Sequence, residues 1–239
     1  MNLLLFSSDD LLASGRLAVS DRRLQHLRQV HRAAVGDTVR VGQIDGHIGL
    51  GTILELSSQR AVIDFELNQC PPAKLPLVLL VALPRPKMLR RIVRSAAEFG
   101  VSELYLINSY RVEKSYWQTP VLAPETLRDY LLLGLEQSRD TVLPNIHLEQ
   151  RFKPFVEDHL PALLENRRGM LAHPSPNAPL LNADADTGHV IAIGPEGGFI
   201  PYEVEKLIAA GFETVSLGPR ILRVENAVTA ALGRLLQRA

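Results

Sequence analysis

Two glycine-rich turns near the C-terminus constrain the fold of this chain more than any other feature. The first turn, residues 194–198, follows the apolar run 189–193 and precedes 201–210, where apolar residues recur at helical spacing. The second turn begins at Gly218, follows the run 213–217 and precedes the last helix. Repeated strand–turn–helix units predict an α/β fold, in which ligands bind beyond the carboxyl ends of the strands. The two turns therefore predict a ligand site.

The composition of the first turn restricts the kind of ligand. Gly194, Gly197 and Gly198 let the backbone approach a ligand closely. The turn has neither the Gly-Lys-Ser/Thr ending of a phosphate-binding loop nor the G-x-G-x-x-G spacing of a dinucleotide site. Glu196 would also place a carboxylate where a phosphate should sit. A neutral or cationic small molecule held by backbone groups is favoured, and a purely structural turn is the alternative.

The rest of the chain divides into two parts. Residues 1–70 contain short apolar runs separated by the turn signals Gly36-Asp37 and Asp45-Gly46, which predicts a small β domain. The proline-rich segment 71–76 is typical of a linker. From residue 77 to residue 239, buried-type strands alternate with helices, which predicts an α/β domain.

Charge and cysteine content limit the partners and the compartment. Lys plus Arg equals Asp plus Glu at 26 each, so RNA binding would depend on local basic patches. The single cysteine, Cys70, cannot form an intramolecular disulfide, which fits the cytoplasm. The sequence shows no apolar run long enough to span a bilayer and no ligand cluster for a metal. We therefore expect a cytoplasmic protein without a membrane or metal partner.

The two turns also carry family motifs. Residues 193–198 (I-G-P-E-G-G) and 217–225 (L-G-P-R-I-L-R-V-E) resemble the motifs of the RsmE-type 16S ribosomal RNA uracil-N3 methyltransferases, which belong to the SPOUT class. The likeness extends upstream to residues 135–139 (L-E-Q-S-R) and 96–101 (A-A-E-F-G-V). It also reaches the N-terminal pattern that begins at His26-Leu27, so it covers nearly the whole chain.

The resemblance implies an α/β fold: a SPOUT-type trefoil-knotted methyltransferase domain preceded by a small PUA-like β-barrel domain that binds RNA. It implies S-adenosyl-L-methionine as the cofactor, 16S ribosomal RNA or the small ribosomal subunit as the partner, and a homodimer. The chain departs from the family pattern at Ser95, at Val30-His31-Arg32 and at residues 110–115, which are segments expected to face RNA. It also has Ile200-Pro201 after the first turn, where no capping side chain is expected.

The turns and the resemblance together assign the cofactor site. The residues expected to contact the cofactor are Leu171, Ala172, His173, Ile193, Gly194, Pro195, Glu196, Gly197, Gly198, Ser216, Leu217, Gly218 and Leu222. Among them, Leu171, Ile193 and Leu222 are expected to provide apolar walls for the adenine. His173 is expected to belong to loop structure and not to act as a catalytic base.

Arg223 and Glu225 are the candidate catalytic residues. Methylation at uracil N3 requires loss of the N3 proton, so the positive charge of Arg223 is expected to stabilise the developing charge on O2 or O4. Glu225 is expected to orient Arg223 or to accept the N3 proton, directly or through water. On sequence alone, a pair that merely stabilises the start of a helix is the alternative.

Local basic stretches are the candidates for RNA contact. Arg22, Arg23 and Arg32 are expected to bind RNA phosphates, and Arg220 to clamp the RNA backbone or to cover the loop. A solvated helix face is the alternative interpretation. Two other functions stay open: a ribose 2′-O-methyltransferase of the related SpoU type, disfavoured by L-R-V-E-N at residues 222–226, and a non-catalytic RNA-binding or ribosome-assembly protein.

Overall fold

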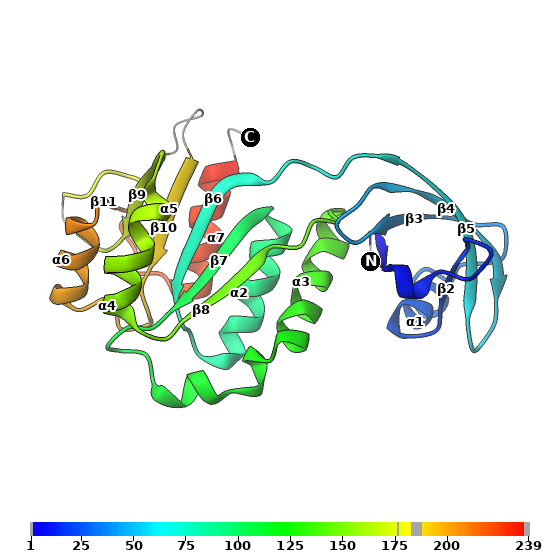
Figure 1. Ribbon diagram of the computed structural model, residues 1–239, viewed down its shortest axis with the longest axis horizontal. Helices are drawn as coiled ribbons and strands as arrows, with labels where there is room; N and C mark the ends of the chain where they lie inside the picture. Colours follow the sequence, from blue (N-terminus) through cyan, green and yellow to red (C-terminus); the bar gives the residue numbers. More distant parts are fainter. Residues whose placement is uncertain (1, 176, 183–187, 237–239) are drawn as a thin grey trace. The chain divides into compact units, whose positions relative to one another are not determined.

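The computed structural model describes residues 2–175, 177–182 and 188–236 (Figure 1). It contains two compact units: Met1–Ala73 with Leu132–Leu143, and Lys74–Leu131 with Pro144–Ala239. The division after residue 73 falls inside the proline-rich segment 71–76. Residues 132–143, which the sequence analysis places in the second domain, fold with the first unit instead.

The first unit is built on a five-stranded sheet with the order β1-β3-β4-β5-β2. The strands are β1 Leu4–Phe6, β2 Leu17–Val19, β3 Thr38–Gln43, β4 Ile48–Leu56 and β5 Ala61–Gln69. β1 pairs with β3 in parallel, and the other pairs are antiparallel. The sheet packs around a buried core that includes Phe6, Val41 and Ile63, to which helix α1 (Arg22–Gln29) adds Leu24 and Leu27. The small β domain predicted from the apolar runs is therefore present.

Residues 132–143 belong to the first unit because their backbone completes its hydrogen bonding. The amides of Asn2 and Leu3 both donate to the carbonyl oxygen of Glu136, at 3.0 and 3.1 Å. The amide of Asp45 donates to the carbonyl of Thr141, and the Asp45 carboxylate accepts from the amide of Leu143, each at 2.9 Å. Such contacts join positions up to 135 residues apart, so local sequence patterns do not reveal them.

The second unit is built on a six-stranded parallel sheet with the order β11-β9-β10-β6-β7-β8. The strands are β6 Leu75–Ala82, β7 Val101–Ile107, β8 Asn145–Glu149, β9 Arg167–Ala172, β10 Gly188–Ile193 and β11 Phe212–Val215. The central strands β6 and β10 are buried on both faces, as their continuous apolar sequences predict. The edge strand β8 is partly exposed and polar, which explains why its sequence gives no strand signal.

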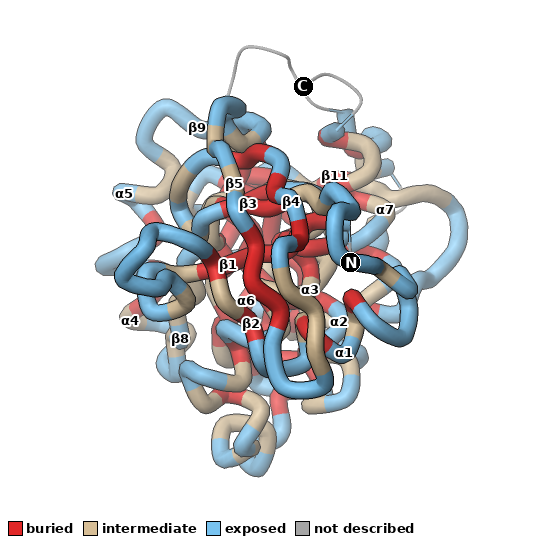
Figure 2. Tube along the Cα trace, turned by 90° about the vertical axis from the view of Figure 1, so that its right-hand side faces the viewer, coloured by how far each residue is buried: buried red, intermediate tan, exposed pale blue. Residues whose placement is uncertain are grey.

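Helices cover both faces of this sheet, with α2 and α7 packed together on one face and α5 on the other (Figure 1). The helices are α2 Pro86–Glu98, α3 Pro124–Ser138, α4 Phe152–Pro154, α5 Leu160–Leu164, α6 Pro201–Ala209 and α7 Val224–Leu236. A π-helical turn, Phe155–His159, separates α4 from α5, where the sequence predicts one helix over 155–164. Buried positions follow the strands and the inner helix faces, whereas the connecting loops are largely exposed (Figure 2). Of the helices that the structure describes, none is long and apolar enough to cross a membrane.

Candidate functional site

A cavity of about 570 Å³ opens at the carboxyl ends of the neighbouring strands β9, β10 and β11. Its volume lies within the range of about 300–1,000 Å³ that small-molecule sites occupy. The walls are formed by residues 172–174, 193–199 and 215–224, together with Arg111 and Ala227. Both glycine-rich turns therefore face one cavity, at the edge of the sheet where ligands bind in α/β folds.

All of the predicted cofactor residues except Leu171 lie in these walls. Leu171 has no exposed surface, because it lies inside the sheet with Ala192 of β10 and Thr214 of β11 as its strand partners. The next residue, Ala172, is the first residue of β9 to reach the cavity. The apolar walls expected for the adenine are therefore reduced to Ile193 and Leu222.

The first turn needs its glycines for both conformation and space. Gly198 has a φ of +74°, a conformation that side chains with a Cβ rarely adopt, and its amide donates to the carbonyl of Pro195 at 2.7 Å. A Cβ on Gly194 would lie 3.1 Å from both the ring and the amide nitrogen of Phe199. The turn is thus tight, and all of its residues, 194–198, line the cavity.

The second turn is held in place from two sides. The amide of Ser216 donates to the carbonyl of Pro179, and the carbonyl of Ser216 accepts from the amide of Leu181, each at 2.8 Å. The Ser216 hydroxyl oxygen also accepts from the amide of Gly218 at 3.1 Å. Gly218 has a φ of +126°, so a glycine is required where the chain turns into the cavity wall.

Helix α6 is capped by a residue that the sequence analysis did not assign. The Glu203 carboxylate accepts a hydrogen bond from the amide of Ile200 at 3.0 Å, which replaces the missing side-chain cap at the helix start. Glutamate at the third helical position is the signal that could have predicted this contact. Only the structure reveals that the same carboxylate also accepts from the hydroxyl of Ser109 and the amide of Tyr110.

Arg111 is a second cavity residue that the sequence analysis did not assign. Its guanidinium donates to the carbonyl of Gly197 in the first turn. A Cβ on Gly197 would lie 2.8 Å from Cδ of Arg111, so this packing depends on the glycine. The two residues are 86 positions apart in the sequence, and no motif connects them.

The two candidate catalytic residues differ in their position relative to the cavity. Arg223 lines the cavity and is exposed, whereas Glu225 lies in the first turn of α7 and does not line it. No ion pair joins the two side chains in the part of the chain that the structure describes. A carboxylate in the first turn also favours the helix electrostatically. Arg220 is exposed and also lines the cavity.

His173 contributes the one titratable imidazole among the cavity walls described. Burial lowers the pKa of this side chain below its ordinary value, which favours the neutral ring. The amide of His173 donates to the carbonyl of Val215 at 3.3 Å, which continues the pairing of β9 and β11. A neutral ring adds no positive charge beside a cationic ligand.

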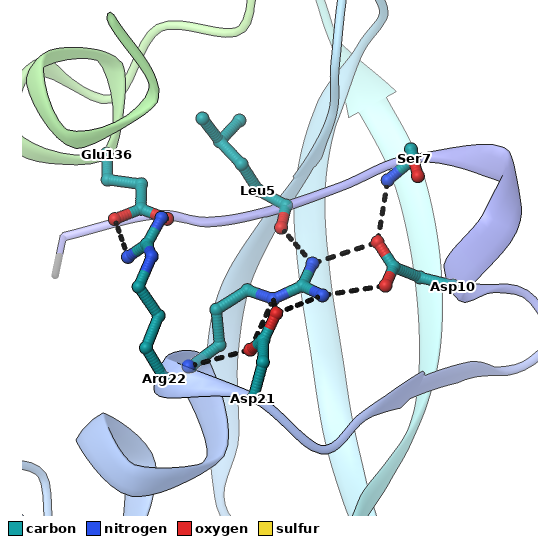
Figure 3. Close-up of polar contacts among 7 residues, drawn as sticks. Leu5, Ser7, Asp10, Asp21, Arg22 and Glu136 are labelled. Atoms are coloured by element: carbon teal, nitrogen blue, oxygen red, sulfur yellow. Dashed lines mark hydrogen bonds and ion pairs between the residues drawn. The ribbon is translucent and has the colours of Figure 1, made fainter. Parts of the chain in front are cut away.

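Arg22 and Arg23, predicted to bind RNA, are both engaged within the first unit (Figure 3). Arg22 forms a bidentate ion pair with Glu136, with both N–O distances at 2.8 Å. Arg23 directs all of its guanidinium donors to Asp10, Asp21 and the carbonyl of Leu5.

Arg23 is the least accessible of the three arginines that the sequence analysis predicts to bind RNA. Its side chain is only 12% exposed, and its donors are satisfied inside the protein. Arg22 keeps about half of its surface exposed, at 48%, although Glu136 already compensates its charge. Arg32 is exposed and remains a candidate for phosphate contact.

Comparisons with known proteins identify relatives over the whole chain. A family model described as an RNA methyltransferase domain matches residues 71–236. The ribosomal RNA small subunit methyltransferase E of Treponema pallidum is 32% identical over 244 residues, covering 100% of this chain and 92% of its own. The enzyme of that name from Synechocystis is 28% identical and is covered over 72% of its length.

Two solved structures share the fold. A ribosomal RNA small subunit methyltransferase E from Neisseria gonorrhoeae, bound to S-adenosyl methionine, superimposes with a TM-score of 0.74 at 20% identity, covering 98% of this chain and 97% of that one. A putative methyltransferase from Legionella pneumophila, in complex with the same cofactor, gives a TM-score of 0.76 at 21% identity and covers 99% and 97%. Both likenesses extend over the two units together.

Proposed function

We propose that this chain, which belongs to the ribosomal RNA small subunit methyltransferase E family, transfers a methyl group from S-adenosyl-L-methionine to N3 of a uridine in 16S ribosomal RNA. The fold class expected from the resemblance, a SPOUT-type trefoil-knotted domain preceded by a PUA-like barrel, is confirmed by the structural relatives. The observation that carries the proposal is the cavity in which both glycine turns meet.

The residues around the cavity fit the cofactor. The walls combine the backbone of the two turns with the apolar side chains of Ile193 and Leu222, a surface suited to an adenine and a ribose. Glu196 is exposed on the cavity wall, where a carboxylate complements a cationic ligand. When bound, S-adenosyl-L-methionine supplies an electrophilic methyl group on a sulfonium.

Arg223 is the proposed catalytic residue. Uracil N3 carries a proton at neutral pH, and if its pKa lies about two units above 7, ionisation costs ~3 kcal/mol. The exposed guanidinium of Arg223 at the cavity wall supplies positive charge that stabilises the uracil anion through O2 or O4. Glu225, in the first turn of α7, is proposed to orient Arg223 or to accept the N3 proton, directly or through water.

The RNA contacts and the assembly are proposed as follows. Arg32 and Arg220 are exposed and are the arginines proposed to contact RNA phosphates, with Arg22 as a paired and weaker contributor. A homodimer is proposed because Ile221, an apolar side chain in the cavity wall, is 91% exposed in the single chain. The cytoplasm is proposed as the compartment because the only cysteine is free, as a reducing environment would keep it.

Calorimetric titration with S-adenosyl-L-methionine tests the cofactor site. The unaltered protein is expected to bind, and Gly197→Trp is expected to abolish binding because a side chain there enters the space of Arg111 and the cavity. Gly233→Ala, in helix α7 and outside the cavity walls, has nothing within 4 Å of the added Cβ and serves as the control that retains binding. Equal affinity of the Gly197→Trp variant would refute the placement of the cofactor.

A further inference from the structure

The strongest unexplained feature of the second unit is the buried carboxylate of Glu203. This side chain is 3% exposed, although it lies on α6 at the surface of the sheet. Its two oxygens accept three hydrogen bonds: Oε1 from the amide of Tyr110 at 2.7 Å, and Oε2 from the hydroxyl of Ser109 at 3.1 Å and from the amide of Ile200 at 3.0 Å. Burial of a carboxylate is tolerated when such donors satisfy it.

The three donors come from two different loops. Ile200 lies between the first glycine turn and helix α6, whereas Ser109 and Tyr110 follow strand β7. Helix capping alone would require only the Ile200 contact. The other two contacts satisfy the buried carboxylate and also hold the loop after β7, residues 108–112, against the start of α6.

The loop 108–112 also places Arg111, the residue after Ser109 and Tyr110, at the cavity. Arg111 lines the cavity and donates to the carbonyl of Gly197. Its approach uses the space that the missing side chain of Gly197 leaves. Glu203 and Arg111 therefore join the same two loops, one through a buried carboxylate and one through a guanidinium at the cavity wall.

We propose that Glu203 is a positioning residue of the cofactor site, which locks the loop 108–112 to the glycine turn so that Arg111 forms one wall of the cavity. The inference rests on the proposed binding of S-adenosyl-L-methionine in that cavity. Glu203 acts through Arg111 and does not touch the cofactor. Arg111 supplies hydrogen-bond donors to the acceptor groups of the ligand.

Glu203→Gln is the informative substitution because it keeps the shape and removes one acceptor. The amide can accept at only one of the two oxygen positions, so either Tyr110 or Ile200 loses its partner and faces a second donor. We expect the affinity for S-adenosyl-L-methionine to fall about tenfold or more, with the KM rising in parallel and kcat at saturating cofactor changing much less. Glu205→Gln, an exposed carboxylate on the same helix, is expected to leave affinity unchanged.

A double-mutant cycle with Arg111→Met separates positioning from general stabilisation. If Glu203 acts through Arg111, Glu203→Gln costs little further affinity once Arg111 is replaced. Fully additive losses, or a lowered Tm with unchanged affinity in Glu203→Gln, would overturn the proposal. Ser109→Ala, which removes one donor and leaves two, gives a milder variant if Glu203→Gln does not fold, and its affinity is expected to fall in the same direction.

Tryptophan fluorescence tests whether Glu203 fixes the loop 108–112, and this test does not require the cofactor. The single tryptophan, Trp117, donates from its indole to Asn108 of the same loop at 3.0 Å. Release of the loop in Glu203→Gln is expected to increase quenching of Trp117 fluorescence by acrylamide, and unchanged quenching would contradict the proposal. If the unaltered protein failed to bind S-adenosyl-L-methionine, the proposed function would fail, while this fluorescence result would still decide the role of Glu203 in the loop.

Discussion

Arginines with the same side chain have different environments in this protein. Arg23 is surrounded by acceptors, Arg22 is paired with Glu136, and Arg32 is exposed. Although burial opposes the charge of Arg23, its hydrogen bonds to the carboxylates of Asp10 and Asp21 raise its pKa above the usual value. The sequence could predict that basic residues cluster near α1, but not which of them form ion pairs within the protein.

Replacement of Arg23 is expected to destabilise the first unit and to leave RNA contacts unaffected. Arg23→Met leaves Asp10 and Asp21 without their main partner, and we expect a loss of roughly 2–4 kcal/mol in the free energy of unfolding, since Asp21 is half exposed. Urea unfolding measures this loss. Arg28→Met, an exposed neighbour on α1, is expected to change stability by less than about 0.5 kcal/mol.

Replacement of Arg223 is expected to affect the rate and not cofactor binding. Arg223→Ala removes the charge proposed to stabilise the uracil anion, so we expect turnover to fall by at least about 10²-fold while the Kd for S-adenosyl-L-methionine stays within a few-fold. Arg220→Ala, the neighbouring exposed arginine, is expected to weaken RNA binding instead. A normal rate for Arg223→Ala in single-turnover assays would exclude its role.

At the scale of the elements, the strand–turn–helix order of the second unit was predictable because each buried parallel strand is a continuous apolar run. The position of the cavity was predictable from the two glycine turns, because the positive φ values at Gly198 and Gly218 require glycine. The second half of α3 was assigned to the second domain because its backbone partners lie near the N-terminus of the chain, far away in the sequence. Glu203 was missed for the same reason, since Ser109 and Tyr110 lie more than ninety positions away.

The contacts of α1 with the N-terminal segment predict how stability depends on pH. Although burial opposes ionisation of Asp10, hydrogen bonds from Arg23 and Ser7 hold the pKa of its carboxyl below 3.8, and the pKa of Asp21 is lowered in the same way by Arg23. A carboxyl group whose pKa is lower in the folded state than in the unfolded state stabilises the protein at pH values above its unfolded-state pKa. This stabilisation is lost as the pH falls through the folded-state pKa.

We therefore expect the urea midpoint of the first unit to fall as the pH drops below about 4. The fall should be smaller in Arg23→Met, because neither carboxyl then has its arginine partner. Equal acid sensitivity of the two proteins would show that these aspartates do not control the transition.

At the scale of the whole molecule, the proposed homodimer gives a role to the exposed apolar surface around the second turn. Ile221 is 91% exposed and Leu222 is 37% exposed, although both line the cavity. An apolar side chain in this position is stabilised when a partner covers it. The second copy would then complete the wall of the proposed active site.

Introduction of a charge at this surface is expected to separate the copies. Ile221→Asp should convert a dimer to a monomer in sedimentation velocity, because a carboxylate is costly to bury in an apolar interface. Ile208→Asp is the matched control, since Ile208 is 48% exposed on α6 and does not line the cavity. A sedimentation coefficient for Ile221→Asp that matches the unaltered dimer would remove this interface.

Identification of the methylated nucleoside tests the central claim most directly. Unmodified small ribosomal subunits are incubated with the protein and S-adenosyl-L-methionine labelled at its methyl group, and the RNA is digested to nucleosides. The account predicts labelled 3-methyluridine with the unaltered protein and none with Arg223→Ala. Label on a ribose 2′-oxygen, or no transfer by a protein that binds the subunit, would contradict it.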